Sequence, residues 1–251
     1  LRIREEHGAA RDVHALLLPL LEASGNHEQL AEVLASELEL ADEPERPALL
    51  AWLADCFLAT ERVADALEAF GEVLAVQSDE PRARARTAEI LSNGEGELRL
   101  RAANILIPVY REEDDAQSLV PALEVIADLD AEPANRLAAL AEAHDRIGAI
   151  GKDKIRMLFL AGRGLREAVS HDLENVPSWL DRISRSENGP SKAAVAETLG
   201  SALRDRAVDH PSLARLAERA GEAYAGAGDL QRAIESYRRV LELEPDNEEA
   251  I

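Results

Sequence analysis

Two consecutive stretches near the end of the chain decide its fold: SLARLAERAGEAYAG at residues 212–226 and LQRAIESYRRVLEL at residues 230–243. In both, small or apolar side chains recur three and four residues apart, which is the rhythm of one helix face. In the first stretch these are Leu213, Leu216, Ala217, Ala220 and Tyr224. In the second they are Leu230, Ala233, Ile234, Tyr237, Val240 and Leu241. Each stretch therefore predicts an amphipathic α-helix.

The residues between the two stretches predict a tight turn. Gly226 and Gly228 are expected to break the first helix, and the Asp229 side chain can cap the second. Pro245 and Asp246 are expected to end the second helix. Two helices joined in this way form a helical hairpin.

This hairpin resembles a tetratricopeptide repeat over residues 214–247, with the family's spacing of about 34 residues. The residues that carry the resemblance are Ala217, Ala220, Gly221, Tyr224, Ala233, Tyr237 and Pro245. Gly221 and Ala233 are small where the two helices must approach closely. Tyr224 and Tyr237 are expected to fill the space around that contact.

Earlier parts of the chain repeat the pattern more weakly, over residues 11–44, 47–80 and 134–172. The chain is thus identified as a degenerate, bacterial-type array of the tetratricopeptide superfamily. The resemblance implies an all-α fold, a right-handed α-solenoid of stacked antiparallel helix pairs. The composition agrees, because only 3 % of the residues are aromatic and the apolar residues are mostly strong helix formers such as Ala and Leu.

We expect one continuous array over residues 1–251, cut from a longer protein because it begins at Leu1 without a methionine. A subdivision into degenerate repeats at 1–188 and C-terminal repeats at 189–251 is compatible with the pattern. Part of the apolar stripe on 230–243 has no following helix to cover it. We therefore expect either a further repeat, opening at 246–251, or self-association through the C-terminal helix pair.

The charge of the chain restricts its partners. Asp and Glu total 49 against 28 Lys and Arg, for a net charge of −21. This disfavours nucleic acid and anionic membranes, and no apolar run reaches the roughly 18 residues of a membrane span. Arg82, Arg84 and Arg86 are expected to form surface ion pairs with nearby Glu. A protein or peptide partner with a neutral or basic surface is favoured.

The sequence predicts no catalytic, metal-binding or cofactor-binding residues, so we expect a protein that is not an enzyme. The six histidines are scattered, and the neighbours His144 and Asp145 should point in different directions on a helix. Gly162-Arg163-Gly164 lacks the third glycine and the preceding strand of a dinucleotide-binding site. Cys56, the single cysteine, should be buried and slightly favours a reducing compartment such as the cytoplasm.

The candidate partner-binding residues are Trp52, Asp55, Arg215, Glu218 and Glu222. Trp52 lies one position off its helix's core stripe, so it faces either a binding groove or the neighbouring repeat. The favoured function is a scaffold that binds a partner peptide or domain in the concave groove of the array. The alternative is a regulatory or sensory region of a larger multidomain enzyme whose catalytic part lies outside this chain.

Overall fold

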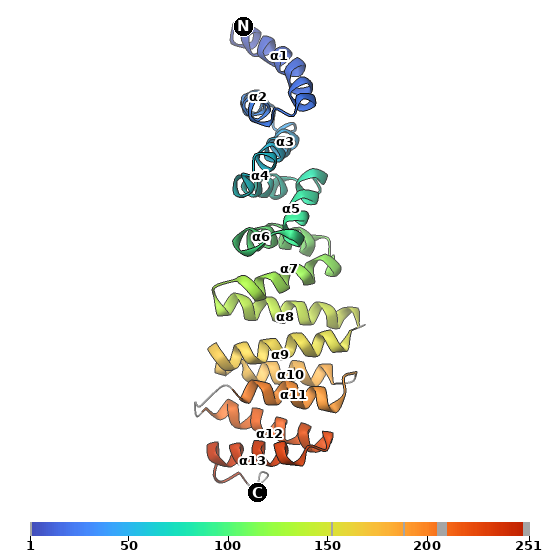
Figure 1. The fold of residues 1–251 in the computed structure, drawn as a ribbon, viewed down its shortest axis with the longest axis vertical. Coiled ribbons are helices and arrows are strands. Elements are labelled where there is room, and N and C mark those ends of the chain that lie inside the picture. Colours follow the sequence, from blue (N-terminus) through green and yellow to red (C-terminus); the bar gives the residue numbers. More distant parts are fainter. Residues whose placement is uncertain (1, 152, 188, 205–209, 248–251) are drawn as a thin grey trace. The chain divides into compact units, whose positions relative to one another are not determined.

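The computed structural model describes residues 2–151, 153–187, 189–204 and 210–247, with side chains from Arg11 onward except Asp12. Within those residues it contains thirteen α-helices, one short 3-10 helix and no β-strand (Figure 1). The α-helices account for more than two thirds of the chain. The expected all-α fold is confirmed.

The helices form two compact units, Leu1–Asp115 and Ala116–Ile251. Unit 1 holds α1 (Arg2–Ser24), α2 (His27–Leu40), α3 (Arg46–Ala59), α4 (Val63–Val76), α5 (Pro81–Asn93) and α6 (Gly96–Glu112). Unit 2 holds α7 (Ala116–Leu129), α8 (Pro133–Ile150), α9 (Lys154–His171), α10 (Val176–Ser186), α11 (Lys192–Leu203), α12 (Pro211–Ala227) and α13 (Leu230–Leu243). Within each unit, helices that follow one another in sequence pack in adjacent pairs, as in a helical repeat array.

The boundary between the units lies well before residue 188, where the sequence placed its subdivision. The helices α9 and α11, which stand on either side of residue 188, pack against each other inside unit 2. The continuity of one array through both units stays a prediction.

The core of unit 1 forms where α2 packs on α3. Leu30 and Leu34 of α2 form one cluster with Leu53 and Cys56 of α3, and all four are buried. Full burial of such side chains stabilises the fold by roughly 1.5–3 kcal/mol each. Trp52 is half-buried and packs against the same cluster.

The core of unit 2 repeatedly packs an aromatic ring on a glycine of a neighbouring helix. A Cβ atom on Gly221 would lie only 2.9 Å from Cζ of Tyr237. This confirms the close approach expected at Gly221. The same arrangement recurs where the Trp179 ring covers Gly164 of α9, and a Cβ there would overlap the ring.

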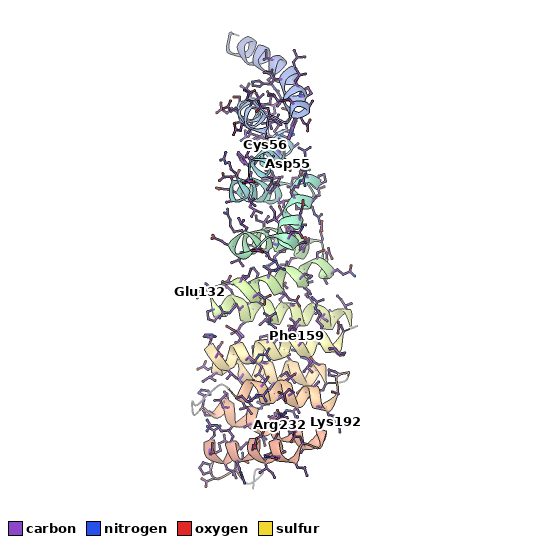
Figure 2. All side chains as sticks on the ribbon, viewed as in Figure 1. Asp55, Cys56, Glu132, Phe159, Lys192 and Arg232 are labelled. Carbon is purple, nitrogen blue, oxygen red and sulfur yellow. The ribbon has the colours of Figure 1, made fainter. Side chains whose placement is uncertain are left out.

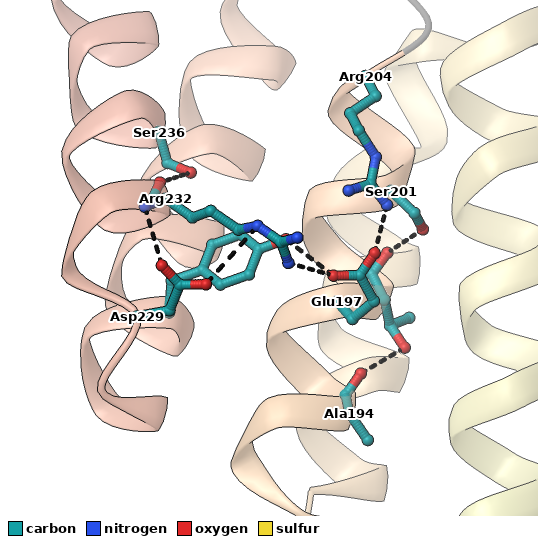
Figure 3. A network of polar contacts seen from close by, with 9 residues as sticks. Ala194, Glu197, Ser201, Arg204, Asp229, Arg232 and Ser236 are labelled. Atoms are coloured by element: carbon teal, nitrogen blue, oxygen red, sulfur yellow. Dashed lines mark hydrogen bonds and ion pairs between the residues drawn. The ribbon is translucent and has the colours of Figure 1, made fainter.

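The turn between α12 and α13 follows the sequence closely. Gly228 ends α12 in the left-handed conformation, at φ +84°, which glycine adopts readily. The Asp229 carboxylate caps α13 by accepting a hydrogen bond from the backbone N–H of Arg232 at 3.2 Å (Figure 3). Gly226, expected to help break the helix, lies instead within α12. A glycine does not by itself end a helix when the residues around it continue to pack in the helical conformation.

Two large apolar residues of the α13 stripe are uncovered, as expected. Leu230 is 67 % exposed and Ile234 is 53 % exposed. The further repeat expected to open at 246–251 lies mostly outside the described residues. The expected self-association through α12 and α13 stays a prediction.

Candidate functional site

A groove of about 660 Å³ opens in unit 1, lined mainly by α3 and α5 beside the end of α1 and the start of α2. We call it the α3–α5 groove. Its apolar lining includes Leu30, Trp52, Leu58, Ala59, Val63, Ile90 and Leu98. Its polar lining includes Glu22, His27, Asp55, Arg82, Arg86, Glu89 and Asn93. Figure 2 labels Asp55 and the adjacent Cys56 on α3.

The spacing of α3 determines which of its side chains line the groove. Trp52, Asp55 and Ala59 are three and four residues apart, so they share one helix face. Ala51 and Ala54, beside them in sequence, are fully buried on the core side. Both interpretations of Trp52 therefore hold, because its ring packs on the core and also lines the groove.

Asp55 holds two arginines of α5 across the groove. Its Oδ2 lies 3.4 Å from Nε of Arg82, and its Oδ1 accepts a hydrogen bond from Nε of Arg86 at 3.2 Å. The Arg82 guanidinium also lies 5.9 Å from the centroid of the Trp52 ring, within cation–π range. Glu89 first and Asp55 second raise the pKa of Arg86, so this residue stays charged.

Arg82 is the residue of the groove best placed to meet a ligand. Its Nε lies on the Asp55 side, and its guanidinium makes no hydrogen bond with any described residue. The expected ion pairs with Glu are confirmed for Arg84, which binds Glu113 at 2.5 Å, and for Arg86, which binds Glu89 at 3.0 Å, whereas Arg82 pairs with Asp55. Sequence reasoning missed the role of Asp55, because only the fold brings it to α5.

Cys56 lies at the bottom of the groove and is 1 % exposed. Burial, followed by the nearby negative charge of Asp55, raises the pKa of its thiol to about 11. Because the thiolate is the nucleophilic form of cysteine, this thiol is chemically quiet at neutral pH. The expectation of a buried, packing cysteine is confirmed.

A smaller groove, of about 360 Å³, lies beside α12 in unit 2 and includes Glu222 in its lining. Arg219, one turn from Glu222, donates a hydrogen bond to Oε2 of Glu222 at 2.8 Å. Arg219 also donates to Oε1 of Glu187 at 3.0 Å. The Arg219 guanidinium thus stands between two carboxylates and offsets part of their negative charge.

The structure brings together only some of the five predicted residues. Trp52 and Asp55 meet in the α3–α5 groove, and Glu222 lines the α12 groove. Arg215 is exposed and Glu218 is half-buried, both on α12 but outside that lining. The preference for a neutral or basic partner stays a prediction.

The expectation that His144 and Asp145 point apart is wrong. Nδ1 of His144 lies 3.1 Å from Oδ1 of Asp145, and its Nε2 lies 3.2 Å from Oγ of Ser186. These are the residue types of a serine hydrolase triad, but His144 is 1 % exposed and Ser186 is fully buried. The Ser186 hydroxyl donates to the carbonyl of Arg182 at 2.8 Å. The arrangement ties α8 to α10 and is closed to a substrate.

Burial is the main cause of a lowered pKa for His144, and it outweighs the opposing hydrogen bond from Asp145. Among the described side chains, no group of three or more His, Cys, Asp or Glu residues is arranged to hold a metal ion. The described helices include none that is both long and apolar enough to cross a membrane.

Comparison with known families identifies one part of the chain. The family model described as tetratricopeptide repeat matches residues 214–247, which cover most of α12 and all of α13. The chain therefore contains a tetratricopeptide repeat at the position where the sequence predicted one. No curated protein matches the chain.

Proposed function

We propose that this chain, which carries a tetratricopeptide repeat, is a scaffold that binds a segment of a partner protein in the α3–α5 groove. The repeat at 214–247 supports a role in protein–protein interaction. The groove supplies the place, and the observation that carries the proposal is the half-exposed Trp52 beside an Arg82 held by Asp55.

The residues that line the groove suit a peptide. Its volume of about 660 Å³ accommodates several side chains of an extended segment. Trp and Arg are the residue types that most often dominate binding energy at protein interfaces. Here one Arg is already positioned against the Trp ring, so little side-chain freedom is lost when a ligand binds.

We also propose that the chain itself is not an enzyme. The Ser186–His144–Asp145 arrangement supports this, because its nucleophile and base are both buried. The alternative, a regulatory region of a larger multidomain enzyme, would use the same groove with a partner segment from elsewhere in that protein.

A random-peptide display library selected on the wild-type protein tests the proposal. Enriched peptides are synthesised and their Kd is measured by fluorescence anisotropy on Trp52→Ala and Arg82→Ala. We expect a loss of about tenfold or more for Trp52→Ala and a smaller loss for Arg82→Ala.

Arg62→Ala is the matched control. Arg62 also stacks on an aromatic ring, at 4.4 Å from the Phe57 centroid, and it also pairs with an aspartate, at 2.7 Å from Asp65. It does not line the groove. If the enriched peptides bind all three variants as tightly as wild type, or if none is enriched, the groove is not the binding site.

A further inference from the structure

The helix α9 of unit 2 carries an apolar stripe that no described helix covers. Ile155 is 71 % exposed and Phe159 is 58 % exposed, one turn further along the helix. Gly162 and Arg166 continue the same face at the next two turns. Figure 2 labels Phe159 on α9. A phenylalanine exposed to this extent beside an exposed isoleucine marks an interaction surface more often than chance.

The opposite face of α9 shows that this exposure is not a general looseness of the helix. Leu160 and Leu165 are fully buried, and Gly164 lies flush against the Trp179 ring. The helix is therefore fixed by its inner face. Its outer stripe contributes little to folding and is available for a partner.

Neighbouring helices frame the stripe on both sides. On the α7 side, Arg156 binds Glu124, with Nη2 to Oε2 at 2.9 Å, and Arg163 forms an ion pair with Asp128. The Arg163 guanidinium also stacks at 5.9 Å from the Phe159 centroid. On the α11 side, Thr198 closes over Gly162, where a Cβ would lie 2.6 Å from Cγ2 of Thr198.

Arg166 gives the surface its charge preference. Its side chain is exposed and makes no hydrogen bond or ion pair with any described residue. The arginines on the α7 side, in contrast, already hold carboxylates. Although the backbone of Arg166 is about 10 Å along the helix from Phe159, at 1.5 Å of rise per residue, its guanidinium reaches back, with Nη1 3.7 Å from where a Cβ on Gly162 would lie.

We propose that this α9 face docks a partner segment that places an apolar side chain on Ile155 and Phe159 and an acidic side chain on the Arg166 guanidinium, which lies beside Gly162 about one turn further along. The apolar contact supplies area, and the charge-assisted bond to the guanidinium fixes the register. This surface is independent of the α3–α5 groove, since it belongs to the other unit.

The test begins with a protein whose groove is disabled. A random-peptide display library is first passed over a triple variant that carries Trp52→Ala, Arg82→Ala and Phe159→Ser, and the peptides that bind it are discarded. The remaining peptides are then selected on the Trp52→Ala, Arg82→Ala double variant. We expect the surviving peptides to combine an apolar residue with Asp or Glu. Their Kd should weaken about tenfold on Phe159→Ala and about threefold to tenfold on Arg166→Gln.

Ile234→Ala and Arg238→Gln are the matched controls, because both residues are exposed in unit 2 but lie on α13 rather than on α9. Neither should change the Kd. Replacing the acidic residue of the peptide by its amide should cost affinity on the parent protein but not on Arg166→Gln, which shows that the two groups interact directly.

Melting temperatures of all variants should match the parent, because the substituted side chains are exposed. Three results would overturn the proposal: no peptide that distinguishes the Phe159 variant, surviving peptides without an acidic residue, or an amide substitution that costs the same on both proteins.

Discussion

The α3–α5 groove and the α9 face are built from the same three components and have different shapes. Each has an aromatic side chain, an arginine stacked on it at 5.9 Å, and an aspartate that holds the arginine. In unit 1 the arginine comes from α5, which packs beside α3, and it stacks on the Trp52 ring. In unit 2 Arg163 stands on the same helix as Phe159 and is pulled sideways toward α7.

The two sites differ in the helix that supplies the cation and in how far the aromatic side chain is recessed. An arginine from a neighbouring helix forms a wall, so Trp52 becomes part of a groove. On the α9 face the arginine comes from the same helix as the ring, and Phe159 is 58 % exposed. The two aromatic side chains should therefore contribute differently to the free energy of unfolding.

The largest effect is expected on the inner face of α9. Gly164→Ala places a methyl group into the buried Trp179 ring, and such overpacking should lower the free energy of unfolding by about 2–3 kcal/mol. Phe159→Ala, on the outer face of the same helix, should change it by less than about 0.5 kcal/mol. Urea denaturation measures both. Equal effects would mean that the outer stripe is part of the core.

Trp52 should contribute to folding where Phe159 does not. Because Trp52 is half-buried on the α2–α3 cluster, Trp52→Ala should lower the free energy of unfolding by about 1–2 kcal/mol. The fluorescence of the remaining Trp179 follows unfolding of unit 2, and circular dichroism follows the whole chain. A variant as stable as wild type would show that Trp52 serves the groove alone.

Acid should weaken unit 2 before unit 1. Burial lowers the pKa of His144 below 6.5 in the folded protein, so the unfolded chain binds the proton more readily. Stability should therefore be full above 6.5 and fall below it, by at most about 1.4 kcal/mol per pH unit. For Glu37 of unit 1, burial raises the pKa, but bonds from Arg11 and His14 outweigh it and keep the pKa below 4.5. Its contribution should be lost only in more acidic solution.

The two tryptophans report on this difference, because each unit has one. Urea unfolding is followed at about one pH unit above and below 6.5, in Trp52→Phe for unit 2 and in Trp179→Phe for unit 1. Unit 2 should lose stability and unit 1 should not. His144→Gln is the control and should remove the dependence. A loss confined to unit 1 would contradict the assignment.

The smallest effect is expected from the aspartates. Asp55→Asn and Asp128→Asn each weaken an ion pair at the protein surface, so each should cost less than about 1 kcal/mol. Thermal melting at low and high salt measures this. If either variant loses more stability than that, its ion pair determines how the helices pack. The aspartates would then serve folding rather than the recognition of a partner.

Much of the fold could be predicted from sequence, because residues that begin or end helices act on their own stretch of chain. Asp229 and Pro245 gave α13 its observed bounds of Leu230–Leu243, and Gly221 marked a close helix contact. Long-range pairs could not be predicted in the same way. Asp55 and Arg86 are far apart in sequence, and nothing between them indicates that α3 and α5 bring them together.

The site was predicted only in part for a similar reason. Trp52 was found because it stood off its stripe, whereas Phe159 was missed because an aromatic residue in a helix is ordinarily taken as core. His144 and Asp145 were misjudged because the direction of the backbone was considered and the freedom of the side-chain rotamers was not.

The buried thiol of Cys56 makes the groove a natural reporter of its own opening. With a pKa of about 11, only about one thiol in ten thousand is ionised at neutral pH. An alkylating reagent would therefore modify the closed chain very slowly. Each fluctuation that parts α3 from α2 would expose the sulfur to water and speed the reaction. A ligand bound in the groove that suppresses this separation would protect the cysteine. The rate of labelling would therefore measure how often the groove opens, without any added dye.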